Sequence, residues 1–104
     1  MRRHEVWLVN LDPTVGSEIH KTRPAVIVSP DELNEHLNTV IVVPLTTGRA
    51  YAFRVKTRVK RTAGVAALDQ VRTIDKRRLI RRLSVLDGAT RARLHAGLAA
   101  LFAP

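Results

Sequence analysis

The chain has 104 residues, 45% of them hydrophobic, which fits one domain, residues 1–104, with its own core. It has no cysteine, which excludes disulfides and thiolate metal sites and is consistent with a cytoplasmic protein. Its net charge is +9, and 13 of the 18 Lys and Arg residues, but only three of the nine Asp and Glu residues, fall in residues 54–104. This asymmetry favours a polyanionic partner, either nucleic acid or an acidic protein segment.

Apolar runs predict a mainly β chain. Short runs rich in Val, Ile and Leu are bounded by turn signals such as Asp12-Pro13 and Leu45-Thr-Thr-Gly48. Pro44 is expected to end or bend the strand that precedes it. The expected strands are residues 5–11, 25–29, 40–43, 52–59 and 64–72, with residues 83–86 as a short strand or an extended segment.

One strand is expected to be half-buried with a basic outer face. Its residues alternate between a mostly apolar set and a basic set. The inner set is Phe53, Val55, Thr57 and Val59, and the outer set is Arg54, Lys56, Arg58 and Lys60.

Three segments carry helix signals. Ser29 is placed to cap a short helix that has Pro30 at its first position, and Asp75 to cap a turn through residues 76–80. Residues 89–102 form an expected amphipathic helix, with leucines at helical spacing: Leu94, Leu98 and Leu101. Several short strands with one terminal helix predict a small, strongly curved β-barrel, and the alternative is an open antiparallel sheet covered by the helix.

Polar side chains gather in three segments that adjoin these strands: residues 16–23, Thr46-Thr47 and residues 68–75. A rigid scaffold can hold such groups in place for binding or catalysis. The guanidinium of Arg23 offers a fork of donors that matches phosphate oxygens, and the Thr46 hydroxyl can donate to the same group. The structural alternatives are that Arg23 pairs with Glu18 or Asp69 to hold the loop, that Asp69 pairs with Arg72 or Arg23, and that Thr46 is an ordinary turn residue.

The same segments, "WLVNLDPTVGSEIHKTRPAVIVSP", "VVPLTT" and "ALDQVRTIDKRRL", resemble the toxins of the MazF/PemK (Kid) family of toxin–antitoxin pairs, in order over about residues 4–86. The resemblance implies a small SH3-like (CcdB- or Kid-like) β-barrel with a C-terminal α-helix, usually as a homodimer. It implies a sequence-specific endoribonuclease, independent of metals and cofactors, that cleaves single-stranded mRNA to 2′,3′-cyclic phosphate and 5′-hydroxyl ends and stops growth. The implied partner is an antitoxin, for which the basic surface suggests an acidic, disordered segment.

The resemblance also assigns residues. Arg23 matches the catalytic Arg of the family's Arg-Pro pair, and Thr46 matches the first Thr after the proline. Glu18 matches an acidic position that serves in catalysis or RNA contact in some members, and Asp69 matches a position used as general base in some members. His20, three residues from Ser17, is a further catalytic candidate. The expected RNA-binding residues are Ser17, Lys21, Thr47, Arg54, Lys56, Arg58, Gln70 and Arg72.

The chain departs from the family pattern at two positions. Ser17 stands where some members have a His, and Ala67 stands where some have an Arg two residues before the acid, so an acid–base pair built on that Arg is missing. Tyr51 and Phe53 are candidates for base stacking, whereas Trp7 is expected in the core.

Two other functions fit the same features. One is a gyrase-targeting toxin of the same fold, which would bind a protein and cut nothing, and the other is a non-catalytic RNA-binding module. The four His residues lack HxH, HxxxH and HExxH spacing, so no metal site is expected. No apolar run approaches the roughly 18 residues that a membrane span needs, and the N-terminus does not look like a secretory signal.

Overall fold

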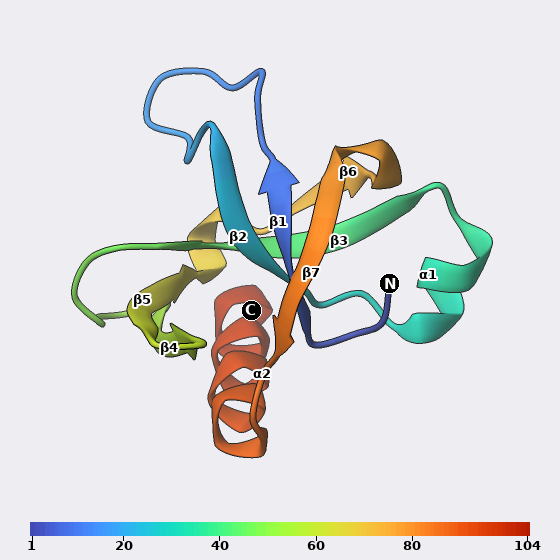
Figure 1. Cartoon of the computed structure of the whole chain (residues 1–104). Helices are drawn as coiled ribbons and strands as arrows, with labels where there is room; N and C mark the ends of the chain where they lie inside the picture. Colours follow the sequence, from blue (N-terminus) through green and yellow to red (C-terminus); the bar gives the residue numbers. More distant parts are fainter.

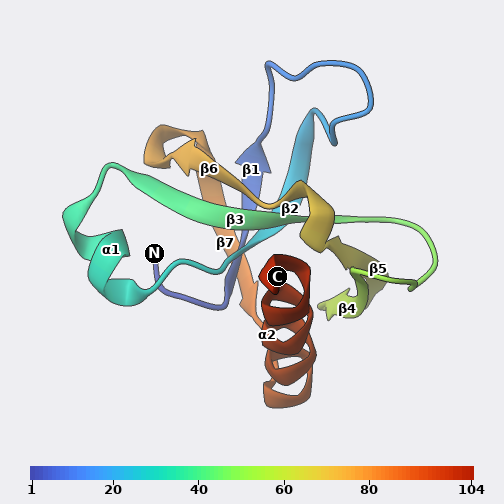
Figure 2. The same ribbon diagram turned by 180° about the vertical axis from the view of Figure 1, so that it is seen from behind.

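One antiparallel sheet dominates the computed structural model, which describes residues 1–104 (Figure 1). The strand order is β4-β5-β3-β2-β1-β7, and β6 also pairs with β3. The strands are β1 (Glu5–Asn10), β2 (Thr22–Ile27), β3 (Thr39–Thr46), β4 (Arg54–Val59), β5 (Thr62–Ala67), β6 (Arg72–Asp75) and β7 (Leu79–Val85). The sheet curls into a half-barrel, as Figure 1 and Figure 2 show from opposite sides.

The helical elements lie around this sheet. They are α1 (Asp31–His36), α2 (Gly88–Phe102) and two 3-10 turns, η1 (Leu68–Gln70) and η2 (Lys76–Arg78). The long helix α2 packs against β4 and η1 (Figure 2). Neither α-helix has the length and apolar character that a membrane span requires.

Apolar side chains are buried on both faces of the central strands, which explains why β2 and β3 contain continuous apolar runs. Successive residues of a strand point to opposite faces, so Val26 packs in one core cluster while Ala25 and Ile27 pack in the other. The first cluster contains Leu94 of α2, and the second contains Ile74 of β6. The helix therefore covers one face, and β6 helps to cover the other.

The terminal helix packs on the core through the three leucines that were expected at helical spacing. Leu94 is fully buried in the first cluster, and Leu98 and Leu101 pack against it while partly exposed. The Asp87 carboxylate caps the helix by accepting a hydrogen bond from the Thr90 backbone nitrogen at 2.7 Å.

Strand β3 continues past Pro44, contrary to the prediction that the proline ends or bends it. On one edge of β3, pairing with β6 stops at Val42 and pairing with β5 begins at Leu45. Pro44 therefore lies in the gap between two partner strands, where no ladder hydrogen bond needs its missing N–H. This continuation carries Thr46 to the end of the strand.

The expected strand over residues 64–72 is two strands separated by η1. Both β5 and β6 pair with the same edge of β3, so the chain has to turn between them. The turn places Asp69 and Gln70 outside the ladder.

The remaining helix and strand predictions are partly confirmed. Asp75 caps η2, as predicted, by accepting from the Arg77 nitrogen. Ser29 does not cap α1, because its hydroxyl donates to Asn34 and accepts from the Ile41 nitrogen, and Pro30 occupies the cap position. The uncertain segment 83–86 lies mostly within β7, which begins four residues earlier, at Leu79.

Candidate active site

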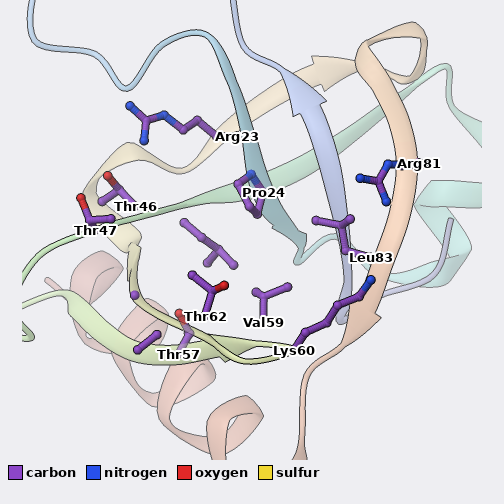
Figure 3. A pocket seen from close by; sticks show the side chains of 13 residues that line it. Arg23, Pro24, Thr46, Thr47, Thr57, Val59, Lys60, Thr62, Arg81 and Leu83 are labelled. Atoms are coloured by element: carbon purple, nitrogen blue, oxygen red, sulfur yellow. The ribbon is translucent and has the colours of Figure 1, made fainter.

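A cavity of about 350 Å³ opens between the end of β3 and the inner side of the half-barrel (Figure 3). Its lining contains three cationic side chains and four threonines, but no Asp or Glu. The lining residues are Arg23, Pro24, Leu45, Thr46, Thr47, Thr57, Val59, Lys60, Thr62, Ala63, Gly64, Arg81 and Leu83. A cavity with this composition favours an anionic ligand.

The pairing of β2 with β3 explains why Arg23 and Thr46 share this cavity. Ala25 lies opposite Pro44 in the antiparallel ladder, so the same register, continued by two residues, places Arg23 opposite Thr46. On its other edge, Arg23 is paired with Val9 of β1. Both predicted catalytic side chains are thus held by a strand and not by a free loop.

Gly64 of β5 lets a second strand approach the same point. Thr46 is paired with Val65, and a Cβ atom added at Gly64 would lie 2.7 Å from the Thr46 carbonyl oxygen. Such a separation is below any ordinary contact, so only glycine fits here without moving the backbone of Thr46.

The Arg23 guanidinium has no carboxylate partner. Its Nε donates to the His20 carbonyl oxygen at 3.3 Å, and it makes no ion pair with Glu18 or Asp69. The structural alternative, in which Arg23 pairs with either acid to hold the loop, is therefore not the arrangement found. Its terminal nitrogens remain available to an anion.

The loop between β1 and β2 carries Glu18 and His20 outside the cavity lining. The Glu18 carboxylate accepts from the Val15 nitrogen within this loop. Gln70 fastens the loop to η1, because its Oε1 accepts from the Ile19 nitrogen at 2.9 Å and its Nε2 donates to the Ser17 carbonyl at 3.4 Å. Gln70, which is expected from the sequence to bind RNA, positions the loop in the structure.

Arg72 has a similar structural contact, since its Nη1 donates to the Leu11 carbonyl at 3.1 Å. Thr47 lines the cavity, whereas Lys21, Lys56 and Arg58 are exposed outside its lining. Of the eight residues predicted to bind RNA, the structure brings only Thr47 together with Arg23 and Thr46.

Asp69 is held by Arg54, a partner that the sequence did not indicate. The two side chains form a bidentate ion pair, with Arg54 Nε 2.6 Å from Oδ1 and Nη2 2.8 Å from Oδ2. The hydrogen bonds from Arg54 are the main cause that lowers the pKa of Asp69 below its usual value. The Arg54 guanidinium also lies 5.7 Å from the centre of the exposed Tyr51 ring.

Several residues of the cavity lining, notably Lys60 and Arg81, were not predicted from the sequence. Lys60 was placed on the outer face of β4, which is wrong, because it lies in the tight turn before β5 with a φ of 55° and so leaves the strand alternation. Arg81 had no distinguishing signal among the many basic residues of its segment. Thr57 and Val59 were correctly placed on the inner face of β4.

Metal-ligating side chains do not converge anywhere in residues 1–104: no group of three His, Asp or Glu residues could hold one ion.

A profile of PemK-like, MazF-like toxins of type II toxin–antitoxin systems matches residues 2–102. The chain belongs to this toxin family. Endoribonuclease PemK of Escherichia coli is 44% identical over 81 residues, which cover 72% of this chain but only 61% of that protein. Endoribonuclease MazF9 of Mycobacterium tuberculosis is 36% identical over 110 aligned positions, which cover 94% of this chain and 92% of the relative. The family predicted from the sequence is confirmed, and the predicted enzyme class agrees with both names.

Solved structures confirm the predicted fold of this toxin. MazF from Deinococcus radiodurans superposes with a TM-score of 0.86 at 25% identity, covering 97% of this chain and 94% of that one. A mycobacterial endoribonuclease in complex with its cognate antitoxin gives a TM-score of 0.83 at 27% identity, covering 100% and 97%. The small barrel with a C-terminal helix is thus the architecture of MazF proteins.

Some family members have an Arg where this toxin has Ala67, and here Arg54 takes the place of that Arg beside Asp69. Ala67 is fully buried, and its cross-strand partner in the β4–β5 ladder is Arg54. The guanidinium beside Asp69 therefore comes from the neighbouring strand instead of from the residue two positions before the acid.

Proposed function

We propose that this toxin is an endoribonuclease that cleaves single-stranded RNA, with the scissile phosphate held between Arg23 and Thr46. The observation that carries the proposal is the shared cavity of these two residues, which is lined by cations and hydroxyls and by no carboxylate. The negative charge of a phosphodiester would meet cations in such a cavity and no second negative charge. The names of the relatives support the same activity.

The proposed reaction uses the substrate's own 2′-hydroxyl as nucleophile. Its oxygen attacks the phosphorus, the bond to the 5′-oxygen breaks, and the products are a 2′,3′-cyclic phosphate and a 5′-hydroxyl. Arg23 and Thr46 stabilise the charge that develops on the phosphoryl oxygens. No metal or cofactor takes part in this scheme.

We assign the base that takes the 2′-hydroxyl proton to Asp69. Two hydrogen bonds from Arg54 fix the orientation of its carboxylate. Asp69 lies outside the cavity lining, so the bound RNA has to extend beyond the cavity to reach it. Its neighbour Gln70 binds the loop whose His20 carbonyl accepts a hydrogen bond from Arg23. We assign His20 to protonation of the leaving oxygen and Glu18 to RNA contact.

The other expected partners are part of the same proposal. An antitoxin with an acidic, disordered segment would neutralise the toxin by occupying its cationic surface, and a mycobacterial relative has been solved with its cognate antitoxin. We further propose that the chain folds as one domain and acts in the cytoplasm. We also propose that it works as a homodimer, and light scattering of the purified toxin tests this oligomeric state.

The proposal is tested by kinetics on a long single-stranded RNA. Arg23→Ala is expected to lower kcat by roughly 100-fold or more, because a charge-stabilising donor is lost. Asp69→Asn keeps an acceptor for Arg54 but cannot take a proton, and is expected to lower kcat as well. Circular dichroism checks that both variants fold.

The same assay separates the alternative functions. RNA binding without cleavage by folded wild-type protein would favour the non-catalytic module. Neither binding nor cleavage, together with inhibition of gyrase, would favour the gyrase-targeting toxin.

A further inference from the structure

The cavity has a second cationic end. In Figure 3 the side chains of Arg23 and Thr46 lie at one side, and those of Lys60 and Arg81 lie at the other. Neither Lys60 nor Arg81 makes an ion pair or a side-chain hydrogen bond within residues 1–104. Two cations that face one cavity without partners favour a second anionic group of the ligand.

Arg81 is directed to the cavity by the alternation of β7. The next residue, Arg82, points the other way and pairs with the buried Glu5 at 3.3 Å. Adjacent arginines thus have different surroundings: Arg82 is part of an ion pair, and Arg81 lines the cavity.

Lys60 reaches the cavity from a strained backbone position. It lies in the two-residue turn between Val59 and Thr62. Its backbone φ is 55°, a value that residues other than glycine, asparagine and aspartate rarely adopt. Glycine would suit this turn better, so the lysine is kept at a conformational cost, a situation typical of functional positions.

The surface between the two cationic ends is apolar, with hydroxyls beside it. Pro24 and Leu83 lie between Arg23 and Arg81, and Val59 lies between Thr46 and Lys60 (Figure 3). Thr57 and Thr62 lie beside Val59. A cationic end, an apolar middle and a second cationic end complement one nucleoside between two backbone phosphates. The volume of about 350 Å³ suits a ligand of that size.

We propose that Lys60 and Arg81 bind the backbone phosphate next to the scissile one, with the intervening nucleoside over the apolar surface. This inference rests on the proposed function, since it takes the scissile phosphate to lie at Arg23 and Thr46. The two residues do not touch the reacting atoms, so they act on substrate binding and leave the chemical step unchanged.

The first test separates binding from chemistry. Arg81→Ala and Lys60→Gly are each expected to raise KM about tenfold at low salt with kcat unchanged, because each removes one phosphate contact. Lys60→Gly also relieves the strained turn, so its thermal stability should not fall. The control is Arg93→Ala on α2, which removes the same charge from an exposed side chain outside the cavity and should leave KM unchanged.

The second test identifies the phosphate. An RNA with a 2′-deoxy nucleotide at the mapped cut site binds without being cut, and each nearby phosphate is replaced in turn by an uncharged methylphosphonate. For wild type, one replacement beside the scissile position should weaken binding by more than the roughly tenfold effect of either single variant. For the double variant Lys60→Gly/Arg81→Ala the same replacement should have no further effect. The slope of log affinity against log salt should become shallower by about 0.7 in the double variant.

The outcomes distinguish this inference from the proposed function. If wild-type toxin cuts RNA, but Arg81→Ala keeps the wild-type KM, salt slope and methylphosphonate profile, the inference is wrong and the nuclease function stands. If Arg81→Ala weakens only the binding of polyglutamate, the cationic end serves an acidic protein and the inference is also wrong. If folded wild-type toxin binds the RNA but never cuts it, the proposed function fails whatever Arg81 does.

Discussion

At the scale of single residues, Arg23 and Thr46 show what sequence can and cannot indicate about this site. Both are indicated by the resemblance to the family, which rests on an Arg-Pro pair before a buried strand and a Thr pair after another. The ion pair between Arg54 and Asp69 is not indicated, because it depends on the register that places Arg54 across from Ala67. The alternation of β4 predicted the wrong face for Lys60, because an alternating pattern does not indicate that this residue has a positive φ.

Replacing Thr46 with Val is the mildest test of its hydroxyl. The two side chains have nearly the same shape, and Val suits the end of a strand, so the folded structure should persist. Loss of a donor to the phosphoryl oxygen should lower kcat by roughly 100-fold. Single-turnover cleavage measures the effect. An unchanged rate in a folded variant would show that the hydroxyl has no part in cleavage and that Thr46 is an ordinary structural residue.

The buried Glu5 makes stability depend on pH in the acid range. Burial alone would raise the pKa of its carboxyl, but hydrogen bonds from the Arg2 nitrogen and the Trp7 indole outweigh burial and lower it below 4.5. The contribution to stability is therefore complete above about pH 4.5 and is lost as the pH falls through the lower folded value.

The corresponding variant is Glu5→Gln, and Trp7, the only tryptophan, supplies the fluorescence signal for unfolding. At neutral pH the variant should be less stable by roughly 1–3 kcal/mol, because charged hydrogen bonds to Arg2, Trp7 and Arg82 are weakened. Between pH 5 and pH 3 its stability should change less than that of wild type. Equal slopes for the two proteins would contradict the assignment.

At the scale of elements, patterning predicted most strands and the terminal helix, but not where the chain breaks between strands. The boundary at η1 exists because β5 and β6 share one edge of β3, and the continuation of β3 through Pro44 exists because its partners change there. Both features depend on pairing between segments that are distant in the sequence, so local strand propensity does not predict them.

Gly64→Ala tests how closely β5 approaches the site. The added methyl group would meet the Thr46 carbonyl at 2.7 Å, so the strand end must move and Thr46 with it. Cleavage should fall by roughly 100-fold, because small displacements of positioning groups are costly. Gly88→Ala is the matched control, since a Cβ atom there meets nothing within 4 Å. Equal activity of the two variants would contradict the role of Gly64.

The contact of the N-terminal segment with α2 contains a histidine pair that should respond to pH. His4 Nε2 and His95 Nε2 lie 2.6 Å apart, so one ring donates and the other accepts. Burial is the main cause that lowers the pKa of both rings, and the charge of Arg3 adds to it. For His4 the partner ring and Arg91 lower the pKa further, while Asp31 opposes them.

Because the unfolded chain binds these protons more readily, stability should fall as the pH drops below about 6.5. His95→Gln can still hydrogen-bond to His4 but does not titrate, so its stability should change less between pH 7 and pH 5. Denaturant unfolding at each pH measures this difference, and identical pH dependence in the two proteins would exclude the pair as its source.

At the scale of the whole molecule, the family resemblance predicted the fold, which the solved structures confirm, and the polyanionic partner that composition indicates stays a prediction. The net charge of +9 indicated a polyanion, and the cavity without carboxylates lies where that polyanion is proposed to react. Neither charge nor composition could show that the cavity has two cationic ends, because Lys60 and Arg81 come together only through the curvature of the sheet.

The most direct measurement is end-group analysis of a single-stranded RNA incubated with wild-type toxin in EDTA. We expect cuts at one short sequence, with 2′,3′-cyclic phosphate and 5′-hydroxyl ends, and no cut where the nucleotide 5′ to the scissile phosphate is 2′-deoxy. Arg23→Ala should leave the RNA intact over the same time. Cleavage that requires added metal ions, or that proceeds at the 2′-deoxy position, would contradict attack by the 2′-hydroxyl at the Arg23–Thr46 cavity.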